Sequence, residues 1–166
     1  RDLSKNASNG MFSFKVTEYS DATYKTEKSD MPSPLFTATS PAIAKDGSGG
    51  ITFPEFTYAI VTNTSEGKVA INHKGMHYYL VEEIIPDAAE DLKLADGSTV
   101  KYLDGIIYDT TKYKIAVSVT DDGKGNLTPV VKKVESDGSI GDTVNESNFT
   151  TEYVFENKYY ATGSIG

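Results

Sequence analysis

The chain has 166 residues, a formal net charge of −8 at pH 7 and no cysteine. Its length suits one domain with a core of its own, and the lack of cysteine excludes disulfides and thiolate metal sites. The negative charge disfavours nucleic acid and anionic membranes as partners, and no apolar run is long enough to span a membrane.

The first clear strand pattern covers residues 11–16, where Phe12, Phe14 and Val16 alternate with polar residues. At the two-residue period of a strand these three side chains face the core, and Lys15 faces solvent. Shorter extended segments are predicted farther along the chain, at residues 35–36, 51–53, 56–58 and, as an edge strand, 69–73.

A central strand is predicted over residues 75–83. Tyr79, Val81 and Glu83 share one face of it, so Glu83 is expected to point into the core and Glu82 to point outward. Because neighbouring residues on a strand face opposite ways, the two glutamates cannot act together as an acid/base pair on one substrate.

His73 and His77 lie four residues apart, which on a helix would place them on one face as a possible metal pair. Here the context is strand, turn and strand around Gly75, so we expect surface histidines and no metal ion. The only helical turn that the sequence predicts lies at residues 86–94.

A second long alternation covers residues 112–119, with Tyr113, Ile115, Val117 and Val119 inward. The segment 121–126 then predicts a hairpin into a strand at 127–131. Its Asp-Gly loop, like those at 96–97, 104–105 and 137–138, suggests either a bound calcium ion or a tight turn. None has the alternating oxygen ligands of an EF-hand, so tight turns are the prediction.

The tail carries the most informative pattern. In a strand over residues 153–159, Asn157 shares its face with three aromatic side chains, those of Tyr153, Phe155 and Tyr159. An unpaired amide is costly in a core. An inward Asn and an inward Glu on separate strands indicate chemistry between side chains. Because nucleophile triads, phosphate loops and nucleotide fingerprints are all missing from the sequence, we do not expect an enzyme that acts on a substrate.

Seven or more short strands separated by turns predict an all-β, antiparallel β-sandwich. Six segments in order resemble the pilin isopeptide-linkage domain of Gram-positive major pilins and surface adhesins. They are Phe12-x-Phe14-x-Val16, Ile51-x-Phe53, the run 78–83, the run 105–109, the alternation 113–119 and Phe155-x-Asn157-x-Tyr159.

The resemblance implies an immunoglobulin-like sandwich that crosslinks itself once, without a cofactor, by joining a lysine to an asparagine. On matching positions Asn157 is the acceptor and Glu83 the acid that shuttles protons. The resemblance also implies an apolar wall around the pair, made of Tyr79, Val81, Phe155 and Tyr159.

In the family, the donor lysine lies on a first strand that precedes the loop before the Phe-x-Phe strand. That loop corresponds here to residues 1–10, so we expect the donor before Arg1, supplied by a neighbouring module or by a peptide in trans. Lys5 is the candidate within the chain. We expect residues 1–160 to form the domain and residues 161–166 to be a linker into a following repeat.

The resemblance implies a structural stalk module on the bacterial surface, anchored to the cell wall through other parts of the full protein and in contact with neighbouring pilin subunits. The alternative is an adhesin domain that binds a host protein or glycan through the tyrosines at 19–24 and 102–108. A secreted enzyme would require a cleft with convergent polar groups.

Overall fold

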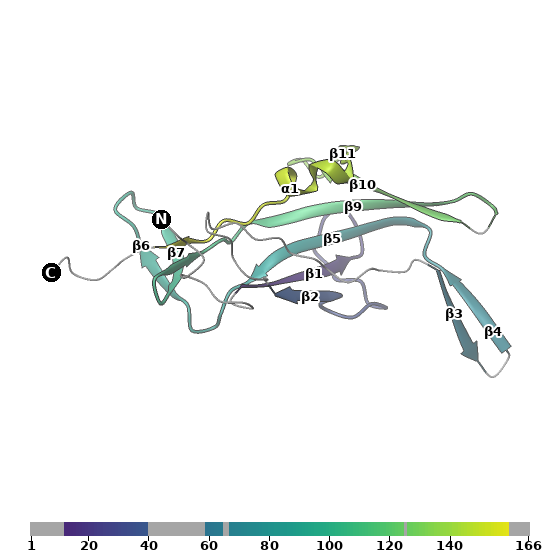
Figure 1. Ribbon diagram of the computed structural model, residues 1–166, viewed down its shortest axis with the longest axis horizontal. Helices are drawn as coiled ribbons and strands as arrows, with labels where there is room; N and C mark the ends of the chain where they lie inside the picture. Colours follow the sequence, from purple (N-terminus) through teal and green to yellow (C-terminus); the bar gives the residue numbers. More distant parts are fainter. Residues whose placement is uncertain (1–11, 40–58, 65–66, 125, 160–166) are drawn as a thin grey trace.

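The computed structural model describes residues 12–39, 59–64, 67–124 and 126–159. Within these ranges the fold is built from antiparallel sheets, with a single short α-helix (Figure 1). The predicted class, an all-β antiparallel sandwich, is confirmed. The segments predicted as strands at 51–53 and 56–58 lie outside the described residues.

The larger sheet has six strands in the order β11-β10-β9-β5-β1-β2. Three of its members, β1, β5 and β9, are the segments in which the sequence shows the clearest alternation. The strands are β1 (Ser13–Tyr19), β2 (Phe36–Thr39), β5 (Gly75–Ile84), β9 (Lys112–Asp121), β10 (Leu127–Val134) and β11 (Ile140–Thr143).

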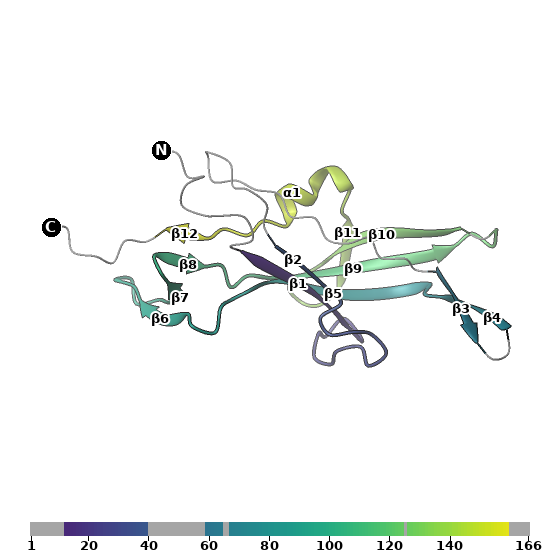
Figure 2. The ribbon, with the colours of Figure 1, turned by 60° about the horizontal axis from the view of Figure 1, so that its bottom comes forward.

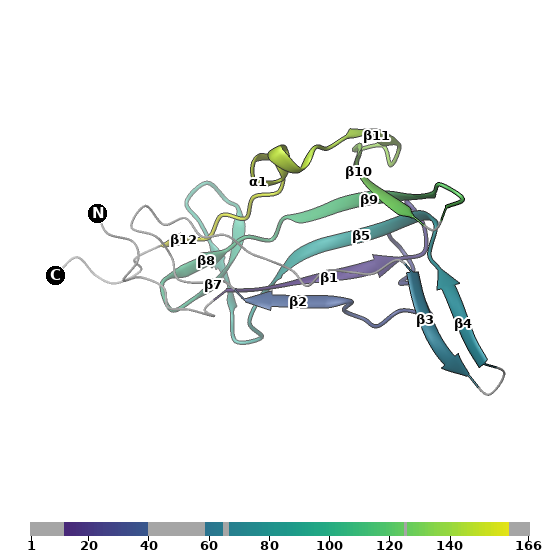
Figure 3. The ribbon, with the colours of Figure 1, turned by 45° about the vertical axis from the view of Figure 1, so that its right-hand side comes forward.

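A second sheet of four strands has the order β12-β8-β7-β6. Its strands are β6 (Glu90–Lys93), β7 (Thr99–Leu103), β8 (Ile106–Tyr108) and β12 (Lys158–Tyr159). A hairpin of β3 (Ala59–Thr64) and β4 (Gly67–Asn72) projects from the opposite end of the elongated molecule (Figure 3).

The two sheets meet through a cluster of buried aromatic and aliphatic side chains. Phe12 and Phe14 come from the β1 end, and Ile106 and Tyr108 come from β8. Farther along the larger sheet, Val16, Tyr79, Val117 and Val119 form a second cluster on the same face. Full burial of each such side chain contributes about 1.5–3 kcal/mol, so these two clusters carry much of the stability.

The connection between β1 and β2 packs on part of the other face of the larger sheet (Figure 2). Tyr24 in this connection donates a hydrogen bond to the Ile115 carbonyl at 2.9 Å and packs against Tyr19 and Tyr78. Tyr24 therefore contributes to packing on this face.

The predicted helical turn at residues 86–94 is wrong. The chain makes a turn in which Ala89 N donates to Pro86 O, and then forms β6. Pairing of β6 with β7 satisfies the backbone of this segment, so tertiary pairing overrides the local preference for a helix. The helix lies elsewhere, as α1 (Phe149–Glu152) after the 3₁₀ turn Glu146–Asn148.

The prediction that His77 is a surface residue is also wrong. His77 is 3% exposed, and its Nδ1 lies 3.0 Å from Oε2 of Glu18, which is 2% exposed. His77 continues the inward parity of Tyr79 on β5, just as Glu18 continues that of Val16 on β1. The tertiary fold thus brings together a buried polar pair that sequence reasoning missed.

The tail was predicted as a strand over residues 153–159, but only Lys158 and Tyr159 pair with β8. The predicted alternation is nevertheless present. Tyr153, Phe155 and Asn157 are half-buried, while the residues between them are exposed. No helix among the described residues is long and apolar enough to cross a membrane.

Candidate functional site

Glu83 occupies a buried position on β5, where the sheets meet. It lies opposite Phe14 in the β1–β5 ladder and is 5% exposed. The pKa of the Glu83 carboxyl is raised to about 7, mainly because burial disfavours the charged form; the Asn157 amide opposes this rise, and the nearby charge of Asp109 adds to it. A carboxyl with this pKa can both give and take a proton near neutral pH.

Both carboxyl oxygens of Glu83 are buried, and neither has a hydrogen-bond partner of normal geometry among the described residues. The Asn157 amide lies close enough to lower the Glu83 pKa as a hydrogen-bond donor, although no hydrogen bond of normal geometry joins the two groups. Because unpaired buried polar atoms are rare and costly in proteins, these two oxygens are a feature that requires an explanation.

The orientation of the Asn157 amide is set by the backbone. Its Oδ1 accepts a hydrogen bond from the Asp109 N–H at 2.8 Å, and an N–H can pair only with the oxygen end of an amide. The amide oxygen is therefore polarised by a donor, and the Nδ2 end remains for the Glu83 side.

Asp109 holds the tail through its side chain as well. Oδ2 accepts from the Glu156 N–H at 2.7 Å, and Oδ1 accepts from the Thr111 N–H at 2.8 Å. The second bond is an Asx turn that fixes the connection between β8 and β9. Backbone and side chain of Asp109 thus contact two successive residues of the tail.

Tyr113 provides a second attachment. Its hydroxyl donates to the Val154 carbonyl and accepts from the Val154 N–H at 3.1 Å. Between these attachments the Phe155 ring packs against Phe14, with centroids 5.0 Å apart, and against Tyr113 at 5.1 Å. Side chains therefore hold this segment where a strand ladder would otherwise do so.

The structure brings three of the residues singled out in the sequence to this point, namely Glu83, Asn157 and Phe155. Tyr79 and Val81 lie on the same face of β5 but belong to the neighbouring cluster around Val117. The Tyr159 backbone pairs with Ile106. Its side chain and Lys5 lie outside what the structure describes.

Two contributors were missed by sequence reasoning, Asp109 and Tyr113. Asp109 stands in the Ile-Tyr-Asp-Thr-Thr run, and the Asp-x-Thr spacing of an Asx turn was the available signal. Tyr113 was assigned to the core by its parity. That parity is right, but nothing local indicates that its hydroxyl reaches the tail.

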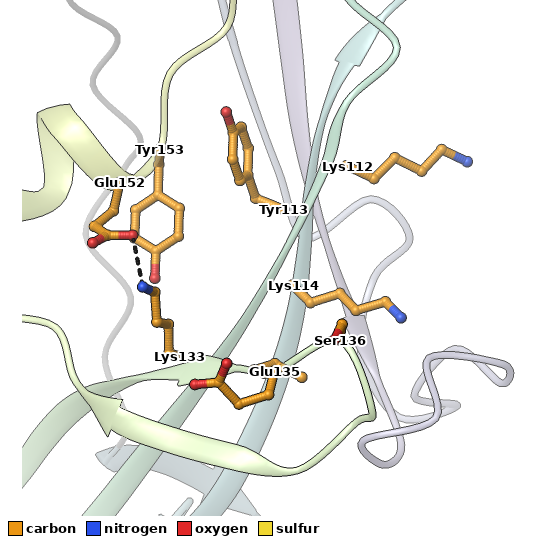
Figure 4. Close-up of a pocket in the computed structure, with 9 residues that line it drawn as sticks. Lys112, Tyr113, Lys114, Lys133, Glu135, Ser136, Glu152 and Tyr153 are labelled. Carbon is orange, nitrogen blue, oxygen red and sulfur yellow. Dashed lines mark ion pairs between the residues drawn. The ribbon is translucent and has the colours of Figure 1, made fainter.

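An open cleft of about 300 Å³ lies beside the start of the tail. Lys133 and Glu152 form an ion pair there at 3.3 Å, next to Tyr153 (Figure 4). Lys112 and Lys114 extend to the other side of β9 from Tyr153 (Figure 4). The charges of Lys133 and Glu152, next to Tyr153 in this cleft, thus compensate each other.

Comparison with known families matches residues 2–160 to the FctA family, described as the Spy0128-like isopeptide containing domain. The match covers nearly the whole chain. The chain belongs to this family. Searches of curated proteins and of solved structures gave no match.

Membership in the FctA family confirms the resemblance seen in the sequence, and identifies the chain as a pilin-type structural domain. Pilins are cell-surface proteins that associate with one another. The site around Glu83 therefore lies within a domain of an isopeptide-containing family.

Proposed function

We propose that this domain is a stalk module of a surface pilus or adhesin, stabilised by one isopeptide bond between Asn157 and a lysine. The observation that carries the proposal is the buried Glu83 carboxyl, which lies beside a half-buried Asn157 amide and has two unpaired oxygens. A lysine amine entering this site would give those oxygens a hydrogen-bond donor.

The reaction is a single transamidation. The neutral lysine amine attacks Cγ of Asn157, the Cγ–Nδ2 bond breaks, and ammonia leaves. Protonated Glu83 gives its proton to Nδ2 as that nitrogen departs and recovers a proton from the attacking nitrogen, so the carboxyl ends as it began. A neutral amine is required because an ammonium group has no lone pair, and burial beside apolar rings favours the neutral form.

Proximity supplies much of the rate acceleration. Holding an amine against an amide makes the step unimolecular, which lowers the barrier by about 7–11 kcal/mol in the best intramolecular cases. The reaction happens once per molecule, so Glu83 acts in self-processing and does not turn over a substrate.

The donor is proposed to lie on a first strand, either before Arg1 or at Lys5. Lys15 is not a good candidate, because it pairs with Glu82 at 3.2 Å on the face opposite Glu83. Among the described strands β12 has one neighbour, β8, so the other edge of β12 suits a first strand that carries the lysine.

Intact mass under denaturing conditions tests the proposal. We expect the chain, or the chain incubated with a first-strand peptide that carries a lysine, to form a covalent product with loss of one ammonia. Asn157→Ala and Glu83→Ala should abolish the product. Glu82→Ala is the matched control, because its carboxyl lies on the opposite face, and it should react normally.

Absence of the product from both the chain alone and the peptide mixture would overturn the proposal. A product that persists in Asn157→Ala would show that another residue is the acceptor. The adhesin alternative gains no specific support from the tyrosines, because Tyr24 is engaged in packing and Tyr108 is buried in the core.

A further inference from the structure

We infer that Asp109 is a third member of the bond-forming site, whose backbone N–H binds the Asn157 oxygen on which negative charge develops and whose carboxylate positions the tail. This inference rests on the proposed function, since it concerns how the same bond forms. Asp109 lies in the connection between β8 and β9 and adds to the expected pair of Glu83 and Asn157.

The N–H has the geometry of an oxyanion donor. When the amine attacks Cγ, the carbonyl oxygen Oδ1 gains negative charge, and the Asp109 N–H already lies 2.8 Å from that atom. A donor placed in advance stabilises this charge without reorganisation during the reaction. The Asx turn, in which Asp109 Oδ1 accepts the Thr111 N–H, fixes the chain that follows Asp109 and so helps to hold the Asp109 N–H in place.

The Asp109 side chain positions the tail. Oδ2 accepts the Glu156 N–H at 2.7 Å, one residue before Asn157, in a stretch that lacks a strand ladder. Loss of this bond frees the residue that carries the acceptor amide. Misplacement of a reacting group by about 1 Å costs on the order of 100-fold in rate.

The Asp109 charge also acts on Glu83. Around this carboxyl, β1 presents Phe14, the tail presents Phe155 and Asn157, and the β8–β9 connection presents Asp109, whose charge raises the Glu83 pKa. The negative charge therefore favours the protonated form of Glu83, which can donate a proton to the leaving nitrogen.

The test follows bond formation over time by denaturing mass spectrometry, in freshly synthesised chain with the donor peptide present. Asp109→Ala is expected to slow the reaction by on the order of 100-fold. Asp91→Asn is the matched control, because this exposed aspartate on β6 pairs only with Lys101 among the described ion pairs. It should react at the normal rate.

The pH profile separates chemistry from structure. With Glu83 acting as the acid, the rate falls as the pH rises through the Glu83 pKa of about 7. In Asp109→Asn, removal of the negative charge should move this fall to lower pH. A residue that only supports the fold would lower the rate at every pH without moving the midpoint.

The N–H itself is tested by replacing Asp109 with its α-hydroxy acid, which keeps the side chain and substitutes an ester oxygen for the N–H. We expect a rate lower by about 100-fold or more, as for other oxyanion donors. Normal rates and an unmoved midpoint in all three variants would overturn the inference while the bond still forms. If the unaltered chain forms no bond, the proposed function itself fails.

Discussion

At the scale of single residues, the fold maintains a carboxyl group in an environment that disfavours its charge. Glu83 faces Phe14 across the β1–β5 ladder and lies near the Phe155 ring, so its carboxylate form is poorly solvated. The pKa rises from 4.5 to about 7, and this shift links the stability of the fold to pH.

The sign of that link follows from proton binding. Between pH 4.5 and 7 the folded protein holds a proton on Glu83 that the unfolded chain releases, so stability falls as the pH rises through this window. Above pH 7 the full cost is about 3 kcal/mol. In an Asn157→Ala background, which removes the crosslink, Glu83→Gln should match its parent at pH 4.5 and be more stable at pH 8.

Urea unfolding followed by circular dichroism at the two pH values measures this difference. Equal effects of Glu83→Gln at pH 4.5 and pH 8 would contradict a raised pKa at this position. Glu82→Gln is the control, because Glu82 pairs with Lys15 and Lys112 on the other face, and should show no gain at pH 8.

The pair of Glu18 and His77 is a second buried polar feature of the same sheet face. Glu18 Oε2 lies 3.0 Å from His77 Nδ1 and 3.7 Å from Lys28 Nζ. Removing His77 takes the nearer partner from the buried Glu18 side chain and leaves Lys28 as its ion-pair partner among the described residues. We expect His77→Ala to reduce the free energy of unfolding by about 1–3 kcal/mol.

Chemical denaturation of His77→Ala checks this value, and Lys101→Ala is the comparison. Lys101 pairs with Asp91 at the surface at 2.7 Å, and its loss should cost at most about 1 kcal/mol. Equal losses in the two variants would show that the buried pair contributes no more than a surface one.

At the scale of elements, the unusual segment is the stretch 153–157, which is extended but has no strand partner in the described sheets. The Tyr113 hydroxyl and the Asp109 carboxylate take the place of ladder partners. Such side-chain attachments define a position while leaving the segment dependent on a few bonds.

Tyr113→Phe removes one of these attachments and keeps the ring that packs on Phe155. We expect a loss of about 1–2 kcal/mol and faster amide exchange at Val154, because the hydrogen bonds to its N–H and C=O are lost. Hydrogen exchange read residue by residue is the measurement, with the β5 and β9 amides as an internal control. Unchanged exchange at Val154 would contradict the role given to this hydroxyl.

The strands that could be predicted are those with clear alternation. The segments 11–16, 75–83 and 112–119 became β1, β5 and β9, because period-two burial is a local signal. The segment 86–94 was mispredicted, since its pairing with β7 is decided by tertiary contacts. In the tail, the alternation correctly predicted that Phe155 and Asn157 face inward, but the predicted strand over 153–159 is paired only at Lys158 and Tyr159.

Two of the four site residues, Glu83 and Asn157, could be predicted from the sequence because they too belong to alternating segments. The inward parity of Glu83 and Asn157 can be read along their own strands, whereas the contacts of Asp109 and Tyr113 join residues 47 and 41 positions apart. The prediction for His77 was wrong because the strand, turn and strand context around Gly75 suggests a surface position, and its partner Glu18 lies 59 positions away in the sequence.

At the scale of the whole molecule, the proposed bond joins the tail to a first strand and so closes nearly the entire domain. Such closure stabilises mainly by restricting the unfolded chain, and for loops of this size the chain-entropy model gives about 5 kcal/mol. Tension applied between the first and last strands would then pass through covalent bonds and leave the sheets folded between them.

The crosslinked domain should accordingly melt on the order of 10 °C above Asn157→Ala and resist protease under conditions that digest the variant. Calorimetry measures the difference in melting temperature, and timed trypsin digestion measures the difference in protease resistance. Because Asn157→Ala also loses the bond from the Asp109 N–H, Asn157→Asp serves as a second variant that keeps a carboxyl oxygen there. Equal melting of all three proteins would contradict a stabilising bond.

The most direct measurement is tandem mass spectrometry of a protease digest of the reacted domain. We expect a branched peptide in which the Asn157 side chain, lighter by one ammonia, is joined to the ε-nitrogen of a lysine on the first strand. This expectation would be contradicted if Asn157 were recovered only in linear, unmodified peptides, both from the chain alone and from the chain with the donor peptide.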